Sequence, residues 1–232
     1  MFRASFSRYA AALLLALAGM AVQAQDQVVP AHEEPRHVPK LVNEWVRIVD
    51  VEIPEGEQTM FHRHSVDYPY VLVSSVTLYN QVYEKEPQDA KMERGFVGYY
   101  DVNAKGAYTH RFINRGPGVF RAIGIELMKS PSLEGKPGLP GIPGVEKVLD
   151  NNRVGAYRIK LAPGATSEPI VLPGPSVRVS VGSGRIRDKI AGSGESTIDL
   201  SPALFQFRDA AVTTTITNEG NQEIELVEIV LK

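Results

Sequence analysis

An internal repeat divides this sequence of 232 residues into two similar halves. A shift of 108 positions aligns Gly56 with Gly164, and near the end of the chain a shift of 104 positions aligns Asn114 with Asn218. Two valine-rich segments can also align by coincidence, because alternating apolar residues match easily. The turn glycines and the Asn-x-Gly corner in both halves favour a true duplication. Such a repeat predicts two copies of one structural unit.

Short segments of alternating apolar and polar residues run through the chain, which is the pattern of half-buried β-strands. Residues 45–53 alternate in this way, residues 54–57 form a turn signal, and such signals recur every eight to twelve residues. The first half shows no long helical period. Many short strands at this spacing predict an all-β sandwich or barrel. Residues 145–151 are the one segment for which we expect one or two helical turns.

Residues 1–24 have the pattern of a secretory signal peptide. Arg3 and Arg8 supply positive charge, residues 10–22 are apolar, and residues 22–24 (Val-Gln-Ala) provide small residues before the expected cleavage point. The apolar stretch is shorter than the roughly 20 residues that span a bilayer. We therefore expect a periplasmic or secreted protein without an integral membrane segment after cleavage. Because the chain has no cysteine, disulfides and a lipid anchor on an N-terminal cysteine are excluded.

Composition marks two further segments. Residues 25–40 are polar and contain three prolines, so we expect a flexible lead-in or an extended arm in which His32 and His37 are solvated. Residues 130–144 (SPSLEGKPGLPGIPG) are rich in proline and glycine, but three Gly-X-Y triplets are too few for a collagen triple helix. A proline-stiffened linker is the expected structure. The predicted boundaries are signal peptide 1–24, arm 25–40, first β domain 41–129, linker 130–151 and second β domain 152–232.

The charge of the chain argues against nucleic acid as a partner. Its net charge is -2, and acidic and basic residues are interspersed without the basic stripe that a phosphate backbone requires. A small molecule is the expected partner. Exposed strand edges and the N-terminal arm are compatible with a homodimer.

Two of the five histidines, His62 and His64, lie two positions apart in a segment expected to be extended. Their side chains would leave the same face of a strand about 6 to 7 Å apart along the backbone, which allows two imidazoles to converge on one metal ion. Two polar side chains on an exposed edge are the alternative. His110 adds a third imidazole on another predicted strand.

These residues resemble the motifs of the cupin superfamily. Its first motif is G-x5-H-x-H-x3-4-E-x6-G, and here Gly56 is followed after five residues by His62, Arg63 and His64. Its second motif ends H-x3-N, which matches His110 and Asn114. The resemblance implies two cupin-like jelly-roll barrels in one chain, a bicupin, with His62, His64 and His110 as ligands of a divalent metal in the first.

The chain departs from the family pattern at several positions. The acidic residue comes after two residues and is Asp67 in place of the usual Glu, and Ser74 replaces the closing glycine. Lys105 and Ala107 stand where the second motif has Pro and Gly. Asp67 is therefore a candidate fourth ligand, and a turn-capping role before Tyr68 is its alternative.

The second copy provides an internal comparison for the three histidines. The aligned positions hold Ile170, Leu172 and Thr214, so all three candidate ligands are absent together. Three residues that are all absent from the same copy are expected to share one role, as the ligands of a single site would. We therefore expect residues 152–232 to form a degenerate barrel without metal.

Three imidazoles, with or without a carboxylate, suit iron, manganese, nickel, copper or zinc. Calcium and magnesium prefer oxygen ligands. An open coordination position on such an ion can polarise a substrate oxygen or activate dioxygen. We therefore expect a metal-dependent oxidoreductase resembling a dioxygenase; a non-catalytic small-ligand-binding protein or a purely structural bicupin is the alternative. Tyrosines near the motif strands are candidates for lining a substrate pocket, namely Tyr70, Tyr99 and Tyr108. The sequence identifies no catalytic residue.

Overall fold

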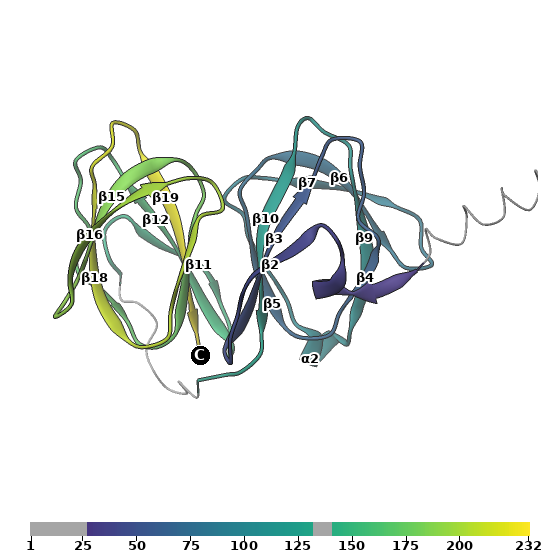
Figure 1. Ribbon diagram of the computed structural model, residues 1–232, viewed down its shortest axis with the longest axis horizontal. Coiled ribbons are helices and arrows are strands. Elements are labelled where there is room, and N and C mark those ends of the chain that lie inside the picture. Colours follow the sequence, from purple (N-terminus) through teal and green to yellow (C-terminus); the bar gives the residue numbers. More distant parts are fainter. Residues whose placement is uncertain (1–26, 132–140) are drawn as a thin grey trace, which may run out of the picture.

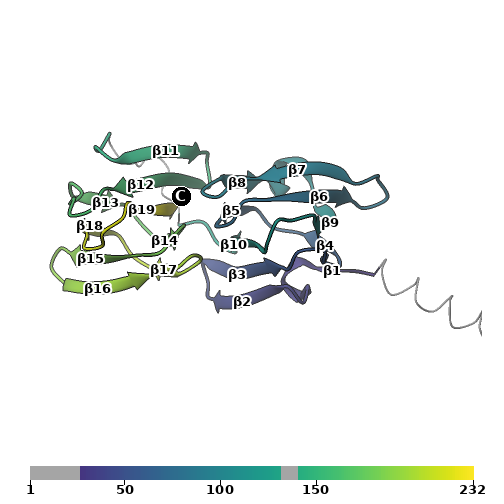
Figure 2. The ribbon, with the colours of Figure 1, turned by 90° about the horizontal axis from the view of Figure 1, so that it is seen from above.

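A computed structural model describes residues 27–131 and 141–232, which form two β-barrels side by side (Figures 1 and 2). The predicted all-β class with two barrels is confirmed. The predicted signal peptide and most of the Pro/Gly-rich stretch lie outside the described residues. No helix among the residues described is long and apolar enough to cross a membrane.

The first barrel consists of two five-stranded sheets, ordered β1-β4-β9-β6-β7 and β2-β3-β10-β5-β8. Its elements are β1 (Val28–Pro30), the 3-10 turn η1 (Ala31–Glu33), β2 (His37–Val42), β3 (Val46–Ile53), β4 (Phe61–His64), β5 (Tyr68–Leu72), β6 (Val76–Val82), β7 (Gln88–Met92), β8 (Val97–Tyr100), α2 (Val102–Lys105), β9 (Tyr108–Asn114) and β10 (Phe120–Leu127).

The second barrel has sheets ordered β11-β12-β19-β14-β17 and β13-β18-β15-β16. Its strands are β11 (Val145–Asp150), β12 (Val154–Leu161), β13 (Ile170–Leu172), β14 (Ser176–Ser180), β15 (Gly184–Ile190), β16 (Gly194–Leu200), β17 (Phe205–Arg208), β18 (Val212–Asn218) and β19 (Ile224–Leu231).

Strand register confirms the duplication. His62 on β4 lies opposite His110 on β9, and the positions aligned with them, Ile170 and Thr214, lie opposite each other on β13 and β18. The corner asparagine makes the same bonds in both copies. Asn114 Nδ2 donates to the carbonyls of Ile53 and Gly118, and Asn218 Nδ2 donates to those of Leu161 and Gln222. A buried amide that satisfies the backbone of two loops fixes where each barrel closes.

The two barrels share one apolar layer in addition to their separate cores. The layer includes Ile48 and Ile125 of the first barrel and Val179 and Ile229 of the second. Strands that contribute to it are buried on both faces, one face in their own barrel and the other in the shared layer. This explains why β19 (IELVEIVL) is almost continuously buried, whereas the outer strand β15 alternates.

The N-terminal segment predicted as a flexible arm is part of the first barrel from residue 28 onward. β1 pairs in parallel with β4, and β2 pairs with β3. Glu34 is buried and accepts hydrogen bonds from the backbone N–H groups of Arg36 and Met60, at 2.7 and 3.1 Å. The prediction of a flexible arm is therefore wrong for these residues, because non-local strand pairing satisfies their backbone despite three prolines.

The predicted helical turn after the linker is also wrong. Residues 145–150 form β11, which pairs antiparallel with β12 and contains an irregularity between Lys147 and Leu149. The available edge of β12 provides the hydrogen-bond partners that a local helical turn would have supplied. The second barrel thus begins before residue 152, and the connection is shorter than predicted.

Candidate metal centre

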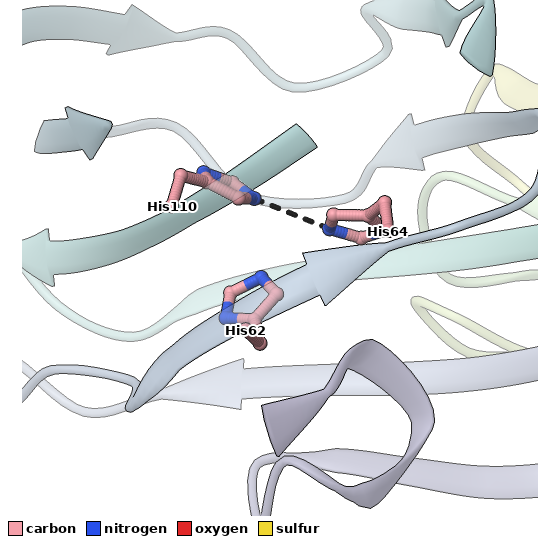
Figure 3. A group of neighbouring side chains, drawn as sticks. All are labelled: His62, His64 and His110. Carbon is pink, nitrogen blue, oxygen red and sulfur yellow. Dashed lines mark hydrogen bonds between the residues drawn. The ribbon is translucent and has the colours of Figure 1, made fainter. Parts of the chain in front are cut away.

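The first barrel gathers His62, His64 and His110 on the inner face of one sheet (Figure 3). His62 and His64 are buried on β4, and Arg63 between them is exposed, as the two-residue period requires. One ligand nitrogen from each of the three histidines lies within 4.8 Å of the others. The structure therefore brings together the three residues that the sequence predicted as ligands.

Hydrogen bonds fix the ring orientation of two of these histidines. Nδ1–H of His62 donates to the Met60 carbonyl at 3.0 Å, and Nδ1–H of His110 donates to Asn80 Oδ1 at 2.9 Å. This assignment leaves a lone pair on each Nε2, the arrangement in which an outer partner prepares a histidine for a metal. Nε2 of His62 is buried without a hydrogen-bond partner among the described residues.

Nε2 of His64 and Nε2 of His110 lie 3.2 Å apart (Figure 3). Two nitrogen lone pairs that face each other at this distance repel unless a proton or a cation lies between them. Together with the unpartnered Nε2 of His62, this geometry fits a metal ion held by three imidazoles.

Burial keeps the three imidazoles neutral. Desolvation is the main cause that lowers the pKa of His62 to about 4 and that of His64 to about 2, and neighbouring imidazoles lower the latter further. The pKa of His110 lies well below its usual range for the same reasons. Since a metal binds only the deprotonated ring, the lone pairs are available at neutral pH.

A fourth imidazole, His37, joins the group from the N-terminal segment. Its side chain is 5% exposed, and its ring centroid lies 4.4 Å from that of His62 in a T-shaped contact. Nδ1–H of His37 donates to the Ala31 carbonyl at 2.7 Å, and burial lowers the pKa of His37 to about 3. The predicted solvation of His37 is therefore wrong.

Asp67 lies outside the histidine group. Its Oδ1 accepts the backbone N–H groups of Val102 and Asn103 at the start of α2, at 2.8 and 3.1 Å. Its Oδ2 accepts Asn103 Nδ2 at 2.6 Å and pairs with Arg153 of the second barrel at 2.9 Å. Both oxygens are thus engaged in capping a helix and in joining the barrels. The prediction of Asp67 as a metal ligand is corrected accordingly, and the alternative, capping of the turn before Tyr68, is replaced by capping of the distant α2.

A cavity of about 300 Å³ opens beside the histidines. The three tyrosines proposed from sequence, Tyr70, Tyr99 and Tyr108, line it together with Tyr68 and Tyr100. The rings of Tyr68 and His64 stack with centroids 4.0 Å apart, and those of Tyr108 and His110 lie 4.5 Å apart. The metal-ligand candidates therefore form one end of an aromatic chamber.

One carboxylate, Glu126, also lines this chamber, and sequence reasoning missed it. Glu126 is 6% exposed and pairs with Arg47 at 2.7 Å across the β3–β10 ladder. Its position on β10, at an alternating site between apolar residues, offered no signal that distinguished it from a surface glutamate.

In the second barrel, the positions that align with two tyrosines of the chamber hold arginines, and these form buried ion pairs. Arg178 and Arg208 replace Tyr70 and Tyr100, as the register of both copies shows. Arg178 is fully buried and donates to Asp188 and to Glu228, at 2.8 and 2.7 Å. Thr214, aligned with His110, donates to Asp188. The residues at the three histidine positions of the second barrel are thus Ile170, Leu172 and Thr214.

Comparisons with known proteins concern the fold. No protein-family model matches the sequence. No curated protein matches it either. Among solved structures, AerE from Microcystis aeruginosa is 12% identical over 86% of this chain and 98% of its own, with a TM-score of 0.55. A mutant of Bacillus subtilis oxalate decarboxylase is 11% identical over 81% of this chain and 69% of its own, also with a TM-score of 0.55.

A cupin domain from Bordetella pertussis Tohama I is 23% identical over 42% of this chain and 99% of its own, with a TM-score of 0.36. At these identities the similarity concerns architecture and carries no activity. The duplicated barrel, the strand order and the similarity to AerE and to oxalate decarboxylase together show that this chain has the bicupin fold, with two barrels in one polypeptide.

Proposed function

We propose that this protein binds a divalent transition metal through His62, His64 and His110 and uses it to act on a small molecule as an oxidoreductase. The observation that supports the proposal most directly is the group of three buried, neutral imidazoles at the end of a cavity. Iron, manganese, nickel, copper and zinc all accept such a donor set.

A bound transition metal would supply a Lewis acid for a substrate oxygen and, if redox-active, a means of activating dioxygen. The residues of the chain orient the metal ligands and exclude water. Met60 and Asn80 orient two of the rings through Nδ1, and the tyrosines exclude bulk water from the chamber.

Metal analysis by mass spectrometry tests this proposal. Purified protein should contain close to one transition metal ion per chain, and the His62→Ala/His64→Ala double variant should contain almost none. His32→Ala is a matched control, because His32 is half-exposed and outside the group. A double variant that keeps the full metal content would refute the proposal.

A non-catalytic binding protein is the second candidate. The observation that favours it is the engagement of both nearby carboxylates, since Asp67 caps α2 and Glu126 pairs with Arg47. Neither is held as a free proton acceptor beside the histidines. A ligand that binds the metal-loaded protein tightly and is recovered unchanged in air would support this candidate over the enzyme.

We also propose that the protein is exported, on the basis of residues 1–24 alone. Fractionation of cells that express the full chain should place it outside the cytoplasm, with Gln25 as its first residue. Full-length protein in the cytoplasm would contradict this.

A further inference from the structure

The walls of the chamber restrict what can bind beside the metal. Five tyrosines line it, and the rings of Tyr68, Tyr100 and Tyr108 form a continuous series from one ligand candidate to another. The centroids of Tyr68 and Tyr100 lie 5.8 Å apart with an interplanar angle of 22°, and those of Tyr100 and Tyr108 lie 4.8 Å apart at 25°. His64 and His110 complete the series at either end. Such walls favour a flat aromatic molecule over a hydrated polar one.

The size of the chamber agrees with a ligand of this kind. Its volume of about 300 Å³ is roughly twice that of the ~150 Å³ cavity that holds one benzene molecule. One substituted ring fits beside a metal ion.

Charge excludes a second class of ligand. Of the described residues, no lysine or arginine lines the chamber. The metal can accept one anionic oxygen, but a distal carboxylate would face tyrosine rings and Glu126 without a cation to pair with. A buried charge without a partner is strongly unfavourable.

The second barrel shows how the same scaffold accommodates carboxylates. At the positions of Tyr70 and Tyr100 it has Arg178 and Arg208, and both pair with Asp188 and Glu228 inside the barrel. The first barrel has tyrosine at both positions. At these two positions the second copy therefore has residues that can bind a carboxylate, and the first copy does not.

We propose that the chamber takes a flat aromatic molecule that binds the metal through a hydroxyl or carbonyl oxygen, and that it discriminates against dicarboxylates. The inference rests on the proposed metal site and names its ligand class. It separates this chain from the oxalate-acting enzyme whose fold it shares.

Calorimetry on zinc-loaded protein tests the inference with two chelating probes, 4-nitrocatechol and oxalate. Zinc is redox-inert, so neither probe is converted. Tyr100→Leu should weaken nitrocatechol binding by about 3- to 10-fold through loss of ring contacts and change oxalate binding less than about 2-fold. Tyr100→Arg, which reproduces the second copy, should strengthen oxalate binding at least about 10-fold. Each comparison is made between protein variants with the same probe, so the intrinsic affinity of zinc for that probe cancels.

Tyr83→Leu is the matched control, because Tyr83 is exposed and lies outside the chamber. If the Tyr100 variants fail to fold, Tyr108→Leu should weaken nitrocatechol binding about 3- to 10-fold, whereas Tyr108→Phe retains the ring and should retain binding. The inference is overturned if wild-type protein prefers oxalate, if neither probe binds, or if Tyr100→Leu, or Tyr108→Leu in its place, leaves both affinities unchanged. Zinc stoichiometry, measured first, separates these results from failure of the metal site, which would overturn the proposed function itself.

Discussion

Acidification of the metal-free protein should destabilise it through its buried histidines. His37, His62, His64 and His110 all have lowered pKa values in the folded state, from a usual value of 6.5 to about 4 or below for the first three. Between pH 7.5 and 5.5 the unfolded chain takes up protons on these groups and the folded chain does not. The free energy of unfolding is therefore highest above pH 6.5 and decreases as the pH falls toward the pKa values that the histidines have in the folded state.

The expected loss follows from the shifts. At pH 5.5, one unit below the pKa of histidine in the unfolded chain, each buried neutral histidine lowers the free energy of unfolding by about 1.4 kcal/mol. Four such histidines lower it by about 5 kcal/mol. This is comparable with the whole free energy of unfolding of many domains, about 5–15 kcal/mol. Burial raises the pKa of the Glu34 carboxyl, which opposes part of this loss. The other carboxylates contribute little in this window, because their usual pKa values lie near 4.

Urea titrations of chelator-treated protein at pH 7.5, 6.5 and 5.5 would measure this loss. The His37→Gln variant should lose about one quarter of the pH dependence, whatever its effect on stability at pH 7.5. A free energy of unfolding that changes by less than about 1.5 kcal/mol over the range would show that the imidazoles are not buried together in the metal-free protein.

Three substitutions test the roles assigned to other polar side chains. Asp67→Ala should lower the free energy of unfolding by about 3 kcal/mol, since Arg153 and the α2 N–H groups lose their partner, while metal content measured by mass spectrometry stays at the wild-type level; loss of metal would restore Asp67 as a ligand. Asn80→Ala should weaken zinc binding about 10- to 100-fold in a competition assay with a chromophoric chelator, because the His110 ring loses its orienting bond; an unchanged affinity would contradict that role. Arg178→Ala should destabilise the protein to urea by about 3–5 kcal/mol, since two carboxylates remain buried without a cation, and it should leave zinc affinity unaltered.

The sequence predicts the fold well because its signals are local or repeated. Alternation identifies strands wherever one face is buried, and the aligned Asn114 and Asn218 identify the duplicated corner. The same repeat links His110 to His62, since the second copy lacks both histidines and has Ile170 and Thr214 at the aligned positions. Strand register then places the two histidines opposite each other.

The residues that sequence reasoning missed or misassigned depend on non-local contacts. His37 enters the site because β2 pairs with β3, where His37 lies opposite Val51, 14 positions later. Asp67 has the residue type of a ligand, but Arg153 of the other barrel and the first turn of α2 occupy its oxygens. Neither partner could be inferred from spacing along the chain.

The apolar layer between the barrels has a symmetry that bears on the origin of the protein. Its members include equivalent positions of the two copies: Val71 corresponds to Val179, and Ile125 corresponds to Ile229. The contact therefore has the character of an isologous interface, in which a surface meets its own counterpart about a two-fold axis. A single-barrel ancestor with this face would have paired with a second copy of itself, and fusion of the genes would have made that pairing permanent. Once fused, the second interior was free to exchange its histidines for other residues, whereas the sheet that faces the first barrel, β11-β12-β19-β14-β17, remained constrained to complement it.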